Sequence, residues 1–263
     1  MKIKRKRTLA TTLVETLPPI GLAGLLATSI LPALAKAKAR ANRIKCVSNI
    51  KQVGSALKAF ANDNNDRYPW LLTAKDEAAQ GSGVSGWSAE TRTLFAQSAV
   101  KASLGSAKIL VSPLDPDRQG VNDGIDLINV DLANPVDDNG HSYGAVNGGA
   151  AKGADEARPG TILCVTRNIS GPANGEDSLS DADVNGGANA ASAFAIWKGA
   201  DKNPLDARTM ASLNANAGQL GAADGSASQS NDADLQAKTN QHHNELGGNY
   251  KGSPSGALDT PND

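Results

Sequence analysis

The clearest hydrophobic pattern in the chain is a run of twenty residues without a charged side chain, from Thr16 to Ala35. As an α-helix, which rises about 1.5 Å per residue, such a run is long enough to cross the hydrocarbon core of a bilayer. Five cations precede it in the leader MKIKRKR. Because positive flanks stay on the cytoplasmic side, the pattern predicts a membrane-inserting segment with the rest of the chain outside.

A second helical pattern follows the apolar run. Apolar residues recur at spacings of four, three, four and three, which places them on one face of a helix. The stripe consists of Cys46, Ile50, Val53, Leu57 and Phe60. We therefore expect residues 36–62 to form an amphipathic helix that packs on a soluble body. The stretch NDNNDRYP, with Pro69 at its end, predicts where this helix stops.

The remaining chain contains short apolar segments separated by clusters of Gly, Asn, Asp and Pro, a pattern typical of strands and turns. The expected strands or strand–turn units are 108–113, 124–132, 160–166, 192–197 and 219–225. One helix is predicted over 88–104, with Ser88 as its N-cap. The predicted fold class is α+β, with a long N-terminal helix packed on a small antiparallel sheet that has long loops. The globular body spans 63–246, and 247–263 reads as a flexible tail.

Charge is distributed unevenly along the chain. Up to Lys58 there are twelve Lys and Arg residues and a single acid, Glu15, whereas the remaining 14 basic and 26 acidic residues give the rest a charge of about −12. The basic clusters flank an apolar run and are not interleaved with aromatic residues, so the sequence does not favour nucleic-acid binding.

Glu15 is the unusual residue of the apolar segment. A secretory signal peptide, cut after the A-x-A site that ends at Ala35, would account for the basic leader and the apolar run. A plain signal anchor would account for them as well. Neither accounts for Glu15, because a carboxylate at the edge of a bilayer costs about 2–3 kcal/mol and is usually functional.

Several segments resemble a known family. TTLVE followed by an apolar run, LPAL, and KCVSNIKQVGSALKAFANDNNDRYP resemble the type IV pilin-like proteins, in particular the pseudopilins of type II secretion with a prepilin-type cleavage and methylation segment. The resemblance covers residues 5–69, and a fainter likeness extends to 108–116, 141–147, 158–170 and 216–229.

The resemblance implies processing and assembly residues. It implies cleavage by a prepilin peptidase between Ala10 and Thr11, which releases the leader 1–10, and methylation of the new N-terminus. A Gly-Phe pair usually flanks the scissile bond in that family, and Ala10 and Thr11 stand in its place here. Glu15 is then expected to pair with the freed amine of a neighbouring subunit. Two opposite buried charges nearly offset their desolvation and fix one register.

The resemblance also implies a function in protein transport without enzymatic activity. The chain is expected to be a structural subunit of a type II secretion or pilus-like fibre, assembled through residues 11–35. Its implied partners are copies of itself, other pseudopilins, the prepilin peptidase, an inner-membrane assembly platform and membrane lipid. Its implied location is the inner membrane, as a single-pass protein with its body in the periplasm or outside, and then the fibre.

The two cysteines, Cys46 and Cys164, fit neither a zinc site nor a redox motif. An even number in a chain with an export signal permits one disulfide between them. The alternative is that both are small, buried apolar groups.

Two stretches resemble calcium-binding loops, although no cofactor is certain. DPDRQGVNDGID supplies oxygen ligands at the spacing of such a loop, from Asp115, Asp117, Gln119, Asp123 and Asp126. DADVNGGANAAS offers Asp181, Asp183 and Asn185 but ends in Ser192. Solvated turns are the alternative for both, because Asp, Asn and Gly are abundant in this chain.

Two further functions remain open on the sequence alone. One is an exported or membrane-anchored binding protein whose acidic loops hold calcium or a glycan. The other is a hydrolase, since GHSYG matches the G-x-S-x-G nucleophile elbow with Ser142 as nucleophile and His242 or His243 as base. The elbow needs a strand before it and a helix after it, and neither is predicted there. Ser142 is otherwise expected to begin a strand that buries Tyr143.

Overall fold

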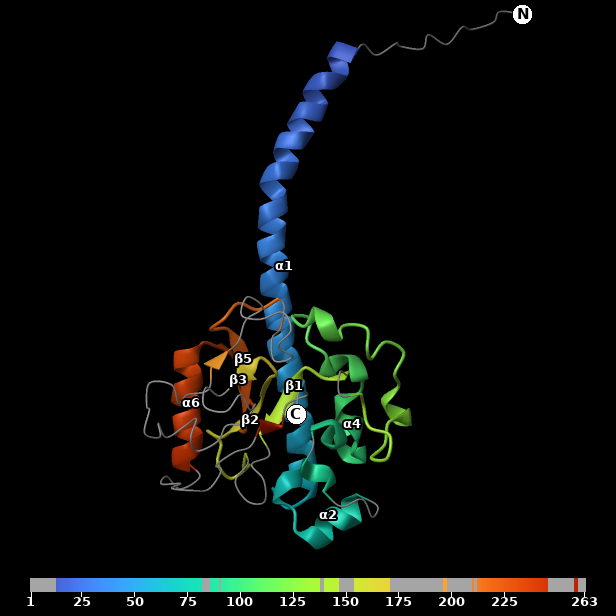
Figure 1. Cartoon of the computed structure of the whole chain (residues 1–263), viewed down its shortest axis with the longest axis vertical. Coiled ribbons are helices and arrows are strands. Elements are labelled where there is room, and N and C mark those ends of the chain that lie inside the picture. Colours follow the sequence, from blue (N-terminus) through green and yellow to red (C-terminus); the bar gives the residue numbers. More distant parts are fainter. Residues whose placement is uncertain are drawn as a thin grey trace, which may run out of the picture. The chain divides into compact units, whose positions relative to one another are not determined.

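The computed structural model describes residues 13–81, 86–89, 91–137, 140–146, 154–170, 196–197, 210, 212–245 and 258–259, without the side chains of 13–21 and of a few others. The chain forms two compact units, Met1–Ala41 and Asn42–Asp263. The second unit contains every described strand (Figure 1). The fold is α+β, with a long N-terminal helix and a small antiparallel sheet, as the sequence predicts.

Helix α1 spans Leu13–Asp63 and ends where the NDNNDRYP stretch predicts. All five residues of the predicted apolar stripe, from Cys46 to Phe60, are fully buried in the body. Among the residues that the structure describes, no helix is both long and apolar enough to cross a membrane. The predicted span includes residues 16–21, whose side chains lie outside the described ones.

The main sheet is antiparallel, with the strand order β6-β5-β2-β1-β7. Its strands are β1 (Tyr143–Val146), β2 (Ile162–Thr166), β5 (Gly218–Ala222), β6 (Ala227–Ser230) and β7 (Leu258–Asp259). The predicted strand at 160–166 and the strand–turn unit at 219–225 are confirmed. A separate pair is formed by β3 (Ile169–Ser170) and β4 (Ile196–Trp197).

Strands β1, β2 and β5 are buried along their whole length, because apolar clusters lie on both faces of the sheet. One cluster contains the α1 stripe together with Ala145 and Cys164. The other contains their neighbours Val146 and Val165, with Leu235 of helix α6. Helix α6 (Asp232–Glu245) thus covers the face of the sheet opposite α1 (Figure 1).

The single helix predicted over 88–104 is wrong, because Gln97 breaks it. Gln97 has extended backbone angles, and its side-chain oxygen accepts hydrogen bonds from the amides of Ala99 and Val100. It therefore caps α4 (Ser98–Leu104) and separates it from α3 (Thr91–Ala96). Ser88 lies in η2 (Trp87–Ala89) and donates to Glu77 of α2 (Ala74–Gln80) instead of capping a long helix.

Two predicted strands, 108–113 and 124–132, are instead short 3-10 turns. The first contains η3 (Ala107–Leu110), and the second contains η5 (Leu127–Asn129), which Asp126 caps through the amide of Ile128. Two more such turns are η1 (Pro69–Leu71) and η4 (Pro116–Arg118). A short 3-10 turn that buries apolar residues has the same kind of short apolar run in its sequence as a short strand. The hydrophobic pattern therefore does not distinguish the two structures.

The segment expected to be a flexible tail contributes to the sheet. Leu258 and Asp259 form β7 and pair with Val146 and Ala145 of β1. The other residues of 247–263 lie outside the described ones. The expectation missed β7 because a two-residue strand is too short to carry a periodic signal.

Candidate assembly surface and buried polar cluster

The first half of α1 presents large apolar side chains to solvent over about two thirds of its circumference. Six of them are between 60 and 70 % exposed: Leu22, Leu25, Leu26, Ile30, Leu31 and Leu34. Adjacent helical residues point about 100° apart, so Leu25 and Leu26 cannot lie on the same narrow stripe. A helix with an apolar surface around most of its circumference is normally buried among other helices or in lipid.

Thr28 and Ser29, the described Ser and Thr residues of this segment, are satisfied within the helix. The hydroxyls of Thr28 and Ser29 both donate to the carbonyl of Leu25, at 2.9 and 3.0 Å. Side chains that bond back to the preceding turn present few free donors to their surroundings. The exposed surface of this half is therefore suited to an apolar environment.

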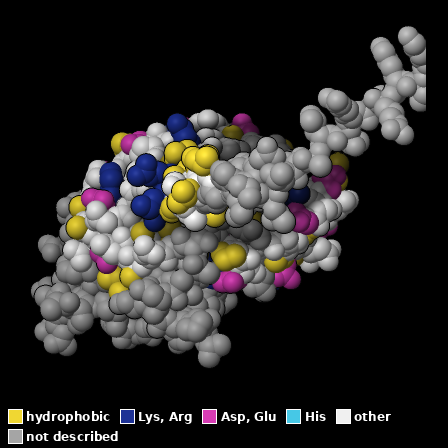
Figure 2. All heavy atoms as spheres, turned by 90° about the horizontal axis from the view of Figure 1, so that it is seen from above, with side chains coloured by type: hydrophobic (Ala, Val, Ile, Leu, Met, Phe, Trp, Pro, Cys, Tyr) yellow, Lys and Arg dark blue, Asp and Glu magenta, His cyan; other side chains and the backbone are white. Residues whose placement is uncertain are grey.

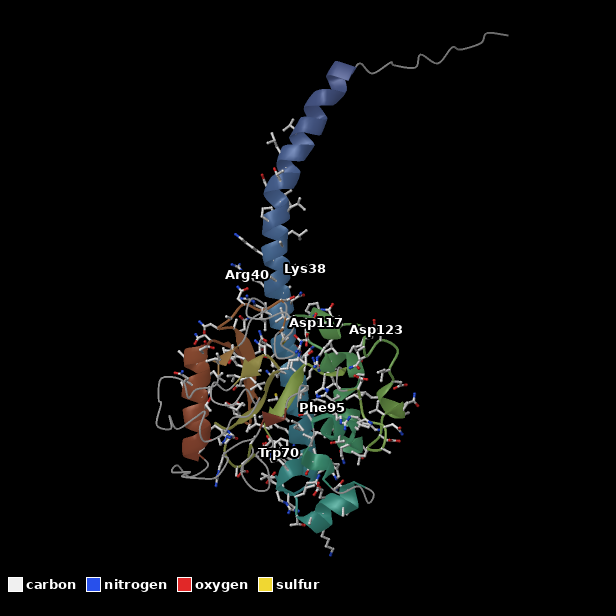
Figure 3. All side chains as sticks on the ribbon, in the orientation of Figure 1. Lys38, Arg40, Trp70, Phe95, Asp117 and Asp123 are labelled. Carbon is white, nitrogen blue, oxygen red and sulfur yellow. The ribbon has the colours of Figure 1, made fainter. Side chains whose placement is uncertain are left out.

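A cationic segment follows directly. It comprises Lys36, Lys38, Arg40, Arg43 and Lys45. In the part of the chain that the structure describes, none of the five forms an ion pair. Figure 3 shows Lys38 and Arg40 on α1, after the apolar half.

The predicted processing residues, Ala10 and Thr11, lie outside the described residues. Glu15 lies in the first turns of α1, but its side chain is not described. The cleavage site and the proposed charge pair therefore stay predictions.

Asp115 is the centre of a buried polar cluster in the body. Its carboxylate, fully buried, receives two hydrogen bonds from Arg167, at 2.6 Å from Nε and 2.8 Å from Nη2. The hydroxyl of Ser142 donates a third, at 2.8 Å. Arg118 Nε lies 4.0 Å away and its Nη1 donates to the carbonyl of His141. This cluster joins the η4 turn, β1 and the end of β2.

The five residues of the predicted calcium loop are engaged in several different contacts, and only Asp115 and Asp117 share a partner, Arg167. Asp115 pairs with Arg167, Asp123 forms an exposed ion pair with Lys108, and Asp126 caps η5. Asp117 lies 3.8 Å from Arg167, and Gln119 donates to the carbonyl of Pro113. Figure 3 shows Asp117 and Asp123 at separate points of the surface. Since calcium requires six to eight converging oxygens, this arrangement does not support the calcium prediction.

The second predicted calcium loop, 181–192, lies outside the described residues. Across the ranges described, no three His, Cys, Asp or Glu side chains gather in an arrangement that could hold a metal ion.

Ser142 directly precedes β1, one residue from the strand start that the alternative interpretation predicted, and Tyr143 beside it is fully buried. The hydroxyl of Ser142 is fully buried and donates to Asp115, a carboxylate already neutralised by arginine. A nucleophilic serine needs an exposed hydroxyl next to a general base. The geometry therefore gives the hydrolase hypothesis no support.

The disulfide that the sequence permits is not formed, because Cys46 and Cys164 are both free and buried. Cys46 lies between Ser112 and Gln219, 3.2 and 3.3 Å from their oxygen atoms. Cys164 points toward the carbonyl of Ile50. Burial raises the pKa of Cys46 to about 11 and that of Cys164 to about 12. Both behave as small core groups, as the alternative predicted.

The histidines are structural where they are described. His141 is buried against the ring of Phe95, with 5.8 Å between ring centroids, and burial lowers its pKa to about 3. His242 of α6 is also buried, and its Nδ1 accepts a hydrogen bond from the amide of Ile162 at 3.0 Å. His242 thereby ties α6 to β2. The side chain of His243 is not described.

A second polar contact set fixes the end of α1 in the body. Lys58 forms an ion pair with Glu156 at 3.2 Å and donates to the carbonyl of Ala223 at 2.9 Å. Tyr68 donates to the same carboxylate, and Trp70 donates to the carbonyl of Ala154. Sequence reasoning missed this set and the partner of Asp115, because single polar residues far apart in the chain carry no periodic signal.

Comparisons of the chain with protein-family models, with curated proteins and with solved structures found no match.

Proposed function

We propose that this protein is a pilin-like structural subunit, which assembles with copies of itself through the first half of α1. The observation that carries the proposal is the set of six large apolar side chains, between Leu22 and Leu34, that are exposed around most of the helix. The resemblance of residues 5–69 to pseudopilins agrees with this function. Its implied activity is assembly, not catalysis.

The energetics favour burial of this surface. Complete burial of one Leu or Ile side chain stabilises the assembled state by about 1.5–3 kcal/mol. Six such side chains together offer on the order of 10 kcal/mol, which is comparable with the cost of association and ordering. If each helix packs among several helices from neighbouring copies, apolar side chains that point in different directions are buried together. In a dimer, only the side chains that face the partner helix would be buried.

The body keeps the second half of α1 fixed. The stripe from Cys46 to Phe60 is in the core, and the Lys58–Glu156 pair and the Tyr68 hydroxyl anchor the end of the helix. The ionic cluster around Asp115 stiffens the same body from the loop side.

Before assembly, in this proposal, residues 11–35 lie in the inner membrane with the body outside. After cleavage at Ala10, the amine of Thr11 neutralises Glu15 of a neighbouring copy. An unpaired carboxylate in an apolar surrounding is strongly unfavourable, so a copy docked one turn out of register would be rejected. Other pseudopilins, the prepilin peptidase and an assembly platform are the partners that this route requires.

The test is the mass of the mature N-terminal peptide together with the polymer yield of a Glu15→Gln variant. The proposal predicts a chain that begins at a methylated Thr11 and a Glu15→Gln variant that is processed but does not polymerise. Asp63→Asn, at the other end of the same helix, is the matched control and should polymerise normally. A mature chain that begins at Lys36, or at Met1, would refute the proposal.

A further inference from the structure

Two large apolar side chains are exposed in the unit Asn42–Asp263, among its described residues. Ile44 is 66 % exposed and Ile128 is 76 % exposed, whereas the other large apolar residues there are buried or partly buried. A single exposed isoleucine is common. Ile44 and Ile128 differ from an ordinary exposed isoleucine because charged side chains lie near each of them.

Ile44 lies on the face of α1 that points away from the core. Its neighbours on that face are Ser48, one turn further, and Lys51, two turns further, and both are exposed. Lys45 is exposed beside it. Neither lysine forms an ion pair in the described part of the chain. Viewed from above, Figure 2 shows Lys and Arg side chains gathered beside hydrophobic ones.

Ile128 lies in the η5 turn between two carboxylates, Asp126 and Asp131. Each carboxylate is fixed by backbone amides: Asp126 accepts from Ile128 at 3.1 Å, and Asp131 accepts from Ala133 and Asn134 at 2.9 and 2.7 Å. Neither forms an ion pair with a described residue. The nearby Lys101 donates to the carbonyl of Val130. The turn therefore presents an apolar side chain with a negative charge on each side.

The two surfaces lie on different parts of the body and do not meet within one molecule. Figure 1 shows the segment of η5, coloured between green and yellow, on the flank of the body away from α1. Two complementary surfaces at different places on one chain make a head-to-tail contact between copies, which continues into a filament when the rotation does not close.

We propose that Ile44 of one copy contacts Ile128 of the next copy, with Lys45 and Lys51 facing Asp126 and Asp131. This inference rests on the proposed function, because it takes a second copy of this chain as the occupant of both surfaces. Opposite charges around an apolar centre fix orientation and exclude the like-charged pairing of two η5 turns or of two α1 faces.

The contact is small, and it does not need to hold two copies together alone. In a fibre already held by packed helices, the second contact forms within one assembly, at a high effective concentration. Its role is to set the rotation between successive bodies. Because its charges are exposed, its contribution weakens as salt screens them.

The first experiment tests proximity in the full-length chain. Ile44→Cys and Ile128→Cys are introduced together, and membranes are treated with a short bifunctional thiol reagent. We expect a ladder of cross-linked copies from the double variant, and none from either single variant or from the unaltered chain, whose own thiols are buried. A ladder in either single variant that equals that of the double variant would overturn the assignment.

The second experiment tests the charges without disturbing the fold. Asp126→Asn with Asp131→Asn keeps the oxygen that accepts each backbone amide but removes both charges. At low salt we expect the cross-link yield to fall about threefold to fivefold, and its remaining salt dependence to disappear. An unchanged yield would contradict the charge complementarity.

Failure of the inference and failure of the proposed function are distinguishable. A photo-reactive residue at Leu25 reports packing of the first half of α1 between copies. If Leu25 cross-links copies but the 44–128 pair does not, the helices assemble and the inference about the body is wrong. If neither cross-links, the proposed function fails and the inference fails with it.

Discussion

The guanidinium of Arg167 and the carboxylate of Asp115 form a two-point ion pair inside the body, with distances of 2.6 Å from Nε to Oδ2 and 2.8 Å from Nη2 to Oδ1. The side chains are 3 % and 0 % exposed. The pair connects the loop before η4 to the residue that follows β2. A buried charge with two arginine donors and a serine donor holds these segments in one arrangement.

Replacement of Arg167 by Met should destabilise the protein by about 3–5 kcal/mol, because Asp115 is left as a buried charge without its main partner. Urea unfolding followed by circular dichroism measures the change. The matched control is Arg158→Met, which removes a partly exposed ion pair with Asp155 and should cost less than about 1 kcal/mol. Equal losses in the two variants would show that the buried pair is not structural.

The stability of the body should depend on pH through His141. Burial and, to a smaller degree, the nearby charge of Arg118 lower its pKa from an ordinary value of 6.5 to about 3. Between these values the unfolded chain binds a proton that the folded chain does not bind, so stability falls as the pH drops below about 6.5. The loss due to this residue should reach about 2 kcal/mol at pH 5.

The contribution of His141 can be isolated by comparison of the unaltered chain with His141→Gln at pH 7 and pH 5. The variant keeps a polar side chain of similar length but has no group that titrates in this range. We expect the fall in the free energy of unfolding to be smaller in the variant by about 2 kcal/mol. Parallel losses in both chains would assign the pH dependence to other groups.

The contact between α1 and the sheet can be tested at two glycines. A Cβ at Gly221 of β5 would lie 2.7 Å from a methyl group of Ile50 and 3.1 Å from the sulfur of Cys164, so Gly221→Ala should cost about 1–3 kcal/mol. At Gly54 of α1 it would lie 3.5 Å from Leu163, an ordinary contact, and Gly54→Ala should stabilise by about 0.5–1 kcal/mol. The midpoint temperature of thermal unfolding should fall in Gly221→Ala and rise in Gly54→Ala.

The two cysteines should be unreactive in the folded protein. Burial raises the pKa of both thiols above the usual range, to about 11 and about 12, so almost no thiolate is present at pH 8. Both should react with a maleimide or an aromatic disulfide after addition of urea, in a stoichiometry of two per chain. Rapid labelling before unfolding, or loss of both thiols in the purified chain, would contradict the free and buried assignment.

Periodicity in the sequence predicted the parts of the fold that carry a repeating signal. The stripe from Cys46 to Phe60 gave the correct helix face, and the apolar run at 160–166 gave a strand of the sheet. Helix α6 was missed because much of it is polar and its deepest apolar residue is Leu235. Its position depends on tertiary contacts, such as the bond from Ile162 to His242.

The buried polar cluster was beyond prediction from the sequence for a different reason. The sequence marks Asp115 as a candidate calcium ligand, with a solvated turn as the alternative, because its neighbours Asp117 and Asp123 have the spacing of calcium ligands. Its actual partner, Arg167, lies 52 residues away. Local spacing does not show which distant cation reaches a carboxylate, and the oxygen-rich loop therefore looked like a metal site.

The central claim is that copies of this chain pack together through the first half of α1. The most direct measurement is photo-cross-linking in membranes, with a photo-reactive amino acid placed in turn at Leu25, Leu26 and Leu34, and at exposed Lys75 of α2 as the control. Because Leu25, Leu26 and Leu34 point in three different directions from the helix axis, we predict a ladder of cross-linked copies from each of the three helix positions and none from Lys75. Only uncross-linked monomer at all three helix positions would contradict the claim.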